Sequence, residues 1–331
     1  MADFRGDIIQ AAAFIGSQFL TQGKTLFVRP RTGGGNGLSP KRALSTLVAA
    51  LAKATADQND VVNLMPESAS YTLTSDLQSV ALDWNKDLVH LIGAGAGSPF
   101  GSRARIGFVS TYVGTGCLFT VSADACFFKN LLFAVDVSSA NPVGCVNVTG
   151  ERNVFENCQF AGMLHANLDT ANNYSLRVSG GENYFHHCII GADTIPRGTA
   201  DNSELVLAST GNGEGARNMF EDCLFVTMAE ADTHQFVKRP ASGSDRSTIF
   251  RNCAFLNFDA GGGATMLEVF DVTAGGSPAG YIDLDSRCYF AGAAAWEASS
   301  GASGVVRYPG YNTNAAISAT SGGRALAVTG A

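Results

Sequence analysis

Charged residues are scarce in this chain. Lys, Arg, Asp and Glu make up 15% of its 331 residues, against roughly 25% in an average soluble domain. The basic residues stand singly apart from the pairs Lys41-Arg42 and Lys238-Arg239, and the formal net charge is −7. Proteins that bind nucleic acid usually carry a basic stripe or patch. We therefore expect no nucleic-acid partner.

Long apolar runs are absent as well. No segment approaches the roughly 20 apolar residues that a membrane-spanning helix needs, so no membrane is expected as a partner. The first residues, Met1 to Asp7, lack the basic and apolar regions of a secretory leader. We expect synthesis in the cytoplasm without export.

Signatures of metal and cofactor binding are also missing. The sequence has no Cys-x-x-Cys pair and no histidine at ligand spacing, so it predicts no metal site. The glycine-rich stretches 33–37 and 93–97 lack the Gly-Lys-Ser/Thr ending of a phosphate-binding loop. Both are interpreted as turns, and no cofactor is expected.

What the chain does contain is a short pattern that repeats. Its cysteines are separated by 30, 35 and 30 residues, which is the period of a coil in a solenoid. A cysteine-free copy spans 128–133, and a degraded one ends at 288–290. The four full or nearly full copies are Asn153-x-Phe155-x-Asn157-Cys158-x-Phe160, Asn183-x-Phe185-x-His187-Cys188-x-Ile190, Asn218-x-Phe220-x-Asp222-Cys223-x-Phe225 and Phe250-x-Asn252-Cys253-x-Phe255.

The spacing within the pattern predicts a corner. Side chains alternate between faces along a strand, so Phe155 and Cys158 can both point inward only if the chain turns between them. The turn falls at Asn157, and Asn and Asp tolerate left-handed backbone better than other residues. His187 is the exception at this position. Short strands meeting at such corners predict an all-β fold, a right-handed single-stranded parallel β-helix with Phe, Cys and Asn ladders inside.

The eight cysteines invite two interpretations. Four of them occupy one fixed position of the repeat, which favours buried thiols that pack as small apolar groups. Neighbouring coils lie roughly 4.8 Å apart, so disulfides between stacked cysteines remain the alternative.

Three parts of the chain are expected. Residues 1–23 contain an amphipathic helix, from Asp7 to Leu20, that closes the end of the β-helix or docks on a partner. Residues 24–290 form the β-helix. Residues 291–331 are rich in Ala, Gly and Ser and form either a flexible end or an arm ordered against a neighbour.

The segment before the repeats resembles a known fold family. The run Gly33 to Pro40, then Ala43 to Leu47, Ala50-Leu51 and Asp60 to Glu67 is similar to the N-terminal segment of pectate-lyase-like β-helix proteins. That family implies the fold, but it hosts many functions. Its polysaccharide-cleaving members use carboxylates and a basic residue on an exposed face.

Candidate catalytic residues lie in the two insertions between repeats. Glycoside hydrolysis needs two carboxyl groups roughly 5 to 9.5 Å apart. The best polar segment is 229–239, because on a strand Glu230, Asp232 and His234 would share one face. A solvated face or subunit contact is the alternative. The other candidates, which show no convergence in the sequence, are Asp193, Asp201, Glu204, Lys238 and Arg239.

Without a convincing catalytic set, the chain resembles structural proteins of tailed bacteriophage virions. The resemblance implies a non-enzymatic capsid auxiliary protein, for decoration or cementing, or a head fibre. Such a protein forms β-helical homotrimers on the capsid surface, contacts the major capsid protein or other virion proteins, and is made in the host cytoplasm. The alternative is a tailspike or tail fibre that binds or depolymerises host surface polysaccharide.

Overall fold

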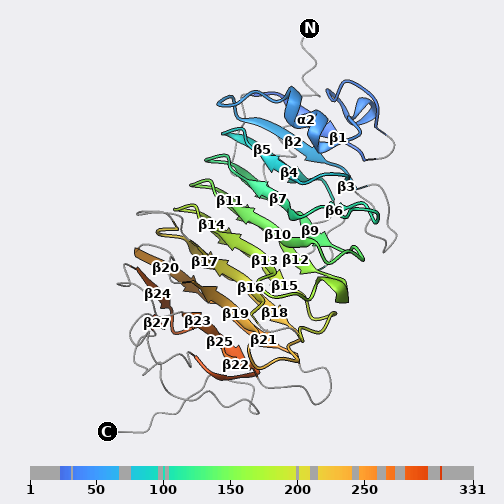
Figure 1. Cartoon of the computed structure of the whole chain (residues 1–331). Helices are drawn as coiled ribbons and strands as arrows, with labels where there is room; N and C mark the ends of the chain where they lie inside the picture. Colours follow the sequence, from blue (N-terminus) through green and yellow to red (C-terminus); the bar gives the residue numbers. More distant parts are fainter. Residues whose placement is uncertain are drawn as a thin grey trace.

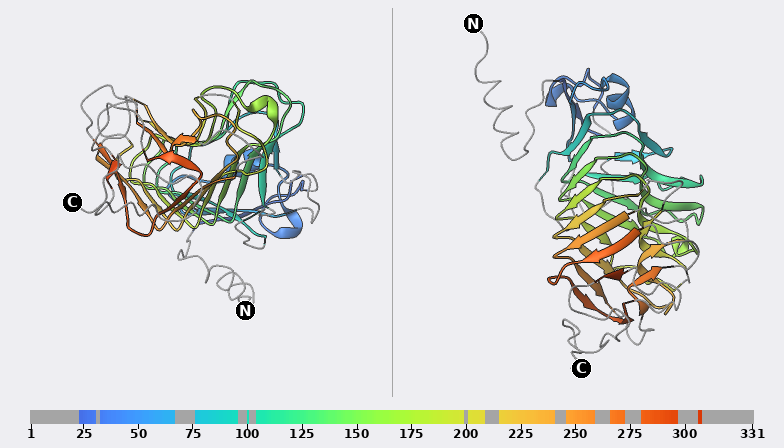
Figure 2. Two further views of the ribbon diagram at one scale, coloured as in Figure 1. Left: turned by 90° about the horizontal axis from the view of Figure 1, so that it is seen from below. Right: turned by 90° about the vertical axis from the view of Figure 1, so that its left-hand side faces the viewer.

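Stacked coils build the protein. The computed structural model describes residues 23–30, 33–66, 76–95, 100, 104–198, 201–208, 215–240, 246–258, 266–272, 280–296 and 306–307. In this part of the chain, coil follows coil from the blue N-terminal end to the red C-terminal end (Figure 1). The end and side views show the same stack (Figure 2). The predicted all-β parallel β-helix is confirmed.

Three long sheets run along the stack, and strands of successive coils pair in parallel, as β11, β14 and β17 do. The ten-stranded sheet contains β1 (Thr25–Val28), β2 (Asp60–Leu64), β5 (Val89–Gly93), β8 (Phe127–Lys129), β11 (Val154–Glu156), β14 (Tyr184–His186), β17 (Met219–Glu221), β20 (Arg246–Arg251), β24 (Gly280–Leu284) and β27 (Val306–Arg307). The eight-stranded sheet contains β3 (Asp76–Gln78), β6 (Arg105–Phe108), β9 (Leu132–Val135), β12 (Gln159–Met163), β15 (Ile189–Gly191), β18 (Leu224–Thr227), β21 (Ala254–Asn257) and β25 (Tyr289–Ala291). The seven-stranded sheet contains β4 (Leu82–Trp84), β7 (Gly116–Val121), β10 (Pro142–Val148), β13 (Tyr174–Val178), β16 (Ser203–Leu207), β19 (Gln235–Arg239) and β23 (Phe270–Val272).

Smaller elements complete the described chain. A two-stranded sheet pairs β22 (Met266–Glu268) with β26 (Ala293–Ala295). Helix α2 (Leu47–Lys53) begins where the Thr46 hydroxyl accepts a hydrogen bond from the Ala49 amide at 3.1 Å. Two 3₁₀ turns, η1 (Pro40–Arg42) and η2 (Ala166–Leu168), lie in connections. None of the described helices is both long and apolar enough to cross a membrane.

The core is filled by stacked phenylalanine rings. One ladder runs along the ten-stranded sheet through Phe128, Phe155, Phe185, Phe220 and Phe250. Neighbouring rings in it are nearly parallel, with centroids 4.5 to 5.0 Å apart. Because the coil spacing matches the stacking distance, identical residues in successive coils fit on one another.

The predicted corner is present in every coil that carries the pattern. The corner residues Asn130, Asn157, His187, Asp222 and Asn252 all have left-handed backbone, with φ between 51° and 56°. Phe155 and Cys158, on either side of one corner, are both buried. His187 therefore adopts the same conformation as the asparagines, although histidine suits it less well.

The asparagine ladder inside the protein is formed by other asparagines than those at the corners. Asn153, Asn183 and Asn218, the first residue of each copy, are at most 1% exposed. The Asn183 Oδ1 accepts a hydrogen bond from the Asn153 amide at 2.9 Å, and its Nδ2 donates to the Gly150 carbonyl at 3.1 Å. Each asparagine side chain thus forms hydrogen bonds with an amide and a carbonyl of the preceding coil.

The two predicted ends have different outcomes. The helix expected at Asp7 to Leu20 lies outside the described residues. Within the expected tail, β26 and β27 pair with strands of the coils, and Trp296 packs on Phe290 with ring centroids 4.0 Å apart. The packing of the β-helix therefore extends beyond residue 290, the boundary expected from composition.

Titration of the thiols after denaturation without reductant is expected to recover all eight cysteines. Seven of them are buried, and in the repeats each thiol lies close to the carbonyl oxygen of a phenylalanine in the preceding coil, as Cys223 Sγ does to Phe185 at 3.4 Å. Burial raises the pKa of Cys126 to about 12, which disfavours the reactive thiolate. Recovery of markedly fewer thiols would instead support disulfides between coils or subunits.

Candidate functional site

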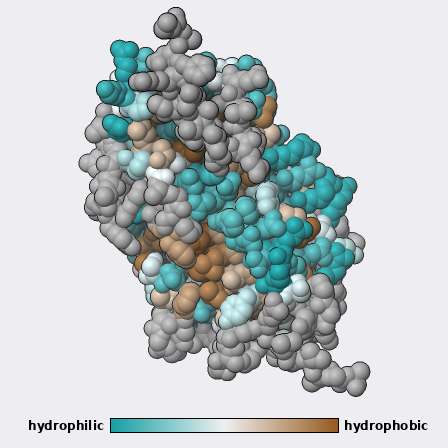
Figure 3. Space-filling model, turned by 180° about the vertical axis from the view of Figure 1, so that it is seen from behind, coloured by the Kyte–Doolittle hydropathy of each residue, from teal (hydrophilic) through white to brown (hydrophobic). Residues whose placement is uncertain are grey.

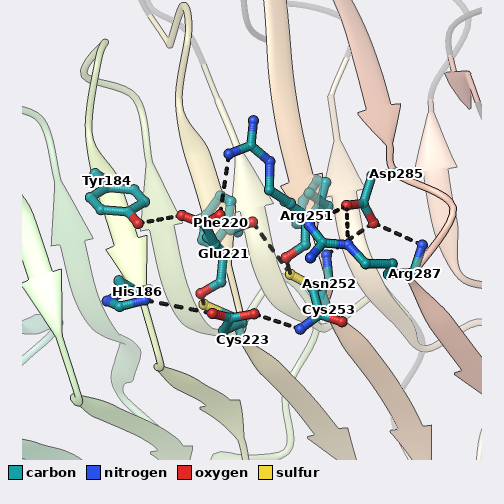
Figure 4. A network of polar contacts seen from close by, with 12 residues as sticks. Tyr184, His186, Phe220, Glu221, Cys223, Arg251, Asn252, Cys253, Asp285 and Arg287 are labelled. Atoms are coloured by element: carbon teal, nitrogen blue, oxygen red, sulfur yellow. Dashed lines mark hydrogen bonds and ion pairs between the residues drawn. The ribbon is translucent and has the colours of Figure 1, made fainter.

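The outer face of the ten-stranded sheet carries charges that pair from coil to coil. Lys129 on β8 contacts Glu156 on β11, with Nζ and Oε1 2.7 Å apart. Glu221 on β17 accepts a hydrogen bond from the Tyr184 hydroxyl and binds Arg251 at 3.2 Å (Figure 4). These contacts connect neighbouring strands through their side chains as well as through their backbones.

This pairing makes Glu221 a poor general acid. The hydrogen bond from Tyr184 and the charge and hydrogen bond of Arg251 outweigh partial burial, and they lower the pKa of Glu221 below its ordinary value. A general acid at neutral pH needs a raised pKa instead. The paired carboxylates of this face, Glu156 and Glu221, are therefore better suited to holding neighbouring coils together than to transferring protons.

The three candidate residues of segment 229–239 do not share a strand face. β18 ends at Thr227 and β19 begins at Gln235, so residues 228–234 connect the two strands and are not a strand themselves. Glu230 and Asp232 are exposed, whereas His234 is buried, 1% exposed, and points into the protein. The expected row of two acids and a base is wrong, because the strand stops before it.

His234 belongs instead to a buried polar cluster. Its Nε2 lies 2.9 Å from the Thr227 hydroxyl and 3.6 Å from Glu204 Oε1, and its Nδ1 contacts Asn202. Glu204 is 1% exposed and also accepts hydrogen bonds from Ser175, at 2.5 Å, and from Thr227, at 2.9 Å. Arg197 faces it at 3.6 Å. The sequence had placed Glu204 and His234 in separate insertions, and the fold brings them together.

The cluster leaves little room for a ligand. The crevice beside it is lined by residues that include Asn173, Arg197, Asn202 and His234. It is nowhere wide enough to admit a water molecule. The cluster therefore holds the two insertions against the coils and does not form an accessible active site.

Glu204 is expected to make the protein sensitive to acid. Burial by itself raises its pKa, but Arg197 and the hydrogen bonds from His234 and Ser175 outweigh burial and lower the pKa to about 2. A lowered pKa in the folded state gives stability that is present above the unfolded value, near 4.5, and is lost as the pH falls towards 2. The difference corresponds to about 3 kcal/mol.

Urea unfolding of the Glu204→Gln variant at several pH values tests this expectation. The variant should be less stable than the wild type at pH 7, and its stability should fall less steeply between about pH 4.5 and 2. Glu230→Gln, at an exposed position, should follow the wild type. Parallel curves for Glu204→Gln and wild type would contradict the assignment.

The remaining candidates do not form one site, and one of them, Arg239, is buried. Asp193 and Asp201 are exposed, and Lys238 Nζ lies 3.4 Å from Asp201 Oδ1. Lys238 also pairs in register with Asp271 on β23, where burial raises the pKa of Asp271. Asp201, Lys238 and Asp271 thus form a second, partly exposed acid-base group. Sequence reasoning missed it because Asp271 lies in a later coil.

The two adjacent histidines are both at the surface. The side chains of His186 and His187 are 28% and 57% exposed. Both lie close to Asp222 of the next coil, with distances from Nε2 to Oδ2 of 3.6 and 3.3 Å.

Known proteins match this chain by structure and not by sequence. Neither a protein-family model nor a curated protein matches the sequence. The pectate lyase Pel9A superposes with a TM-score of 0.54 at 15% identity, over 87% of this chain and 68% of that one. The chain shares the parallel β-helix fold of this pectate lyase.

Two pectin methylesterases share the pectate-lyase-like fold. The enzyme of Aspergillus niger, in deglycosylated form, has a TM-score of 0.54 at 14% identity, over 88% of this chain and 84% of that one. PemA of Erwinia chrysanthemi has a TM-score of 0.53 at 14% identity, over 85% of this chain and 81% of that one. At such low identity these likenesses establish the fold alone.

Proposed function

We propose that this pectate-lyase-like chain is a non-enzymatic structural protein of a tailed-bacteriophage virion, a capsid decoration or cement protein or a head fibre. The proposal rests on the observation that the polar groups of the outer sheet and of the buried cluster pair with one another. On the outer sheet Glu156 and Glu221 pair with neighbouring coils, and inside Glu204 and His234 satisfy one another in a closed cluster. The described polar groups thus stabilise a stiff stack.

The proposed assembly is a homotrimer of parallel rods. The described surface carries a hydrophobic area between hydrophilic regions on the face turned away in Figure 1 (Figure 3). Contiguous apolar surface on a soluble protein marks an interaction site, and a second copy of the chain would cover it. The partners are two further copies of the chain and the major capsid protein.

Two measurements test the role and the assembly. Sedimentation equilibrium of the purified chain should give three times the monomer mass of 34.5 kDa. Electron microscopy of intact particles of the virus that encodes the chain should place it on the capsid surface. Density at the tip of the tail would overturn the capsid role and support the alternative below.

A tailspike or tail fibre that acts on host polysaccharide is the second candidate. It is favoured by the group Asp201, Lys238 and Asp271, and by the fold shared with enzymes that act on pectin. The test is incubation with an acidic polysaccharide and an assay for newly formed chain ends. Activity that is lost in Asp271→Asn, but retained in Glu230→Gln, would establish this candidate and exclude the non-enzymatic one.

A further inference from the structure

The corner at His187 brings two successive side chains to one side of the chain. Along a regular strand His186 and His187 would point to opposite faces. At the corner between β14 and β15 the left-handed backbone of His187, with φ 51°, interrupts this alternation. The two rings consequently stack at the surface, with centroids 3.8 Å apart and planes 30° apart.

Stacking of the coils adds a carboxylate to this pair. Asp222 occupies the corner of the next coil, and its Oδ2 lies 3.6 Å from His186 Nε2 and 3.3 Å from His187 Nε2. The three side chains can each offer one ligand atom, and these atoms all lie within 4.8 Å of one another. Within the described residues, no other three His, Cys, Asp or Glu side chains meet this condition.

The geometry suits a small transition-metal ion. Two imidazole nitrogens and a carboxylate oxygen are ligands that Zn²⁺ prefers, with bonds of about 2.0 to 2.2 Å. In a tetrahedron with such bonds, neighbouring ligand atoms lie about 3.3 Å apart. The two distances to Asp222 Oδ2 are close to this separation. We propose that His186, His187 and Asp222 form a surface site for Zn²⁺ or a similar divalent transition metal.

Neighbouring residues orient the proposed ligands. Asn252 donates a hydrogen bond from Nδ2 to Asp222 Oδ1 at 2.5 Å, which leaves Oδ2 directed at the histidines. The Tyr184 ring stacks on His186, with centroids 5.6 Å apart. Figure 4 shows Tyr184, His186 and Asn252 on the same outer face. Such outer contacts are a regular feature of metal sites, because they fix the ligand atoms before the metal arrives.

The departure from the repeat supports a role for His187. The equivalent corners hold Asn130, Asn157, Asp222 and Asn252, residues that tolerate left-handed backbone. Histidine departs from the Asn or Asp of the other corners, and residues that break a local rule tend to mark functional positions. A bound ion would connect the corners of two coils and resist their separation. This inference does not depend on the proposed virion role.

Titration of the metal-free full-length protein with ZnCl₂ by calorimetry tests the site. One strong site per chain is expected in the wild type. The variants His187→Asn and Asp222→Asn place the usual corner residue at each position, so they should fold normally and bind at least tenfold more weakly. His165→Asn changes a partly exposed histidine elsewhere and should bind like the wild type.

Cobalt and thermal melting provide the second readout. Co²⁺ in the wild type should show the visible absorption of a four-coordinate ion, and saturating Zn²⁺ should raise Tm. Neither effect should occur in His187→Asn. Unchanged binding in His187→Asn, or an equal loss of binding in His165→Asn, would overturn the proposal. Absence of Zn²⁺ binding in the wild type would overturn it as well, and Asp222 would then only pair with the histidines.

Discussion

Replacing Phe220 by aspartate is expected to abolish soluble assembly. Phe220 is fully buried and lies between two parallel rings, 4.5 Å from Phe185 and 5.0 Å from Phe250. Loss of the ring alone would destabilise the fold by about 3 to 5 kcal/mol. An unpaired carboxylate in the core adds several kcal/mol more. Together these penalties approach the whole stability of a typical domain, about 5 to 15 kcal/mol.

The neighbouring residue offers a matched control. Met219 precedes Phe220 on β17, and by the alternation of the strand its side chain points outward. Met219→Asp should therefore remain soluble and melt within a few degrees of the wild type. Solubility and thermal melting of both variants decide the matter. A Phe220→Asp protein that assembles and melts normally would show that the inward assignment is wrong.

Replacing Asn183 by alanine is expected to destabilise the protein by about 2 to 6 kcal/mol. The change removes the partners of the Asn153 amide and the Gly150 carbonyl, which are both buried. Each unsatisfied buried group costs about 1 to 3 kcal/mol. The free energy of unfolding, measured with urea at neutral pH, should show this loss.

Asn157→Gly separates the role of the ladder from the loss of an asparagine in general. Asn157 lies at a corner, where it bonds Asn130 at 2.7 Å, and glycine accepts its left-handed backbone without strain. This variant should lose less than about 1 kcal/mol. If both variants lost the same free energy, the interior ladder would have no special part in stability.

The sequence was sufficient for the fold because the repeat encodes it redundantly. The positions of Phe155, Asn157 and Cys158 predict an inside, a corner and a second inside, and the same assignment recurs in each copy. Burial and backbone angles agree with it at every copy, including His187, where the residue type alone argued against a corner.

The inward asparagines were missed for a physical reason. The alternation of side chains along a strand was used to assign apolar residues to the core. Asn153 has a polar side chain, so this rule did not predict that it points inward. Its function depends on backbone groups of another coil, whose position is known only once the coils stack. The available signal was the recurrence of asparagine at positions 153, 183 and 218.

The polar groups depended even more on tertiary structure. The grouping of Glu230, Asp232 and His234 assumed that all three lie on one strand, but β18 ends at Thr227. His234 instead lies beside Glu204, which comes from another insertion. His186 and Asp222 are far apart in sequence and adjacent only through the register of β14 with β17. Residues of different coils that lie side by side are about 30 or more residues apart in the sequence, and rules for the spacing of residues within one helix or strand do not predict such contacts.

The interior asparagines have a consequence for how the length of this protein can change in evolution. Every asparagine of the ladder bonds the coil before it through the same pair of backbone groups, as Asn153 and Asn183 both do. A duplication or deletion of one whole coil, about 30 residues, would therefore rejoin equivalent groups and leave the ladder continuous. Such a gene could lengthen or shorten its product in discrete steps while each intermediate stayed folded.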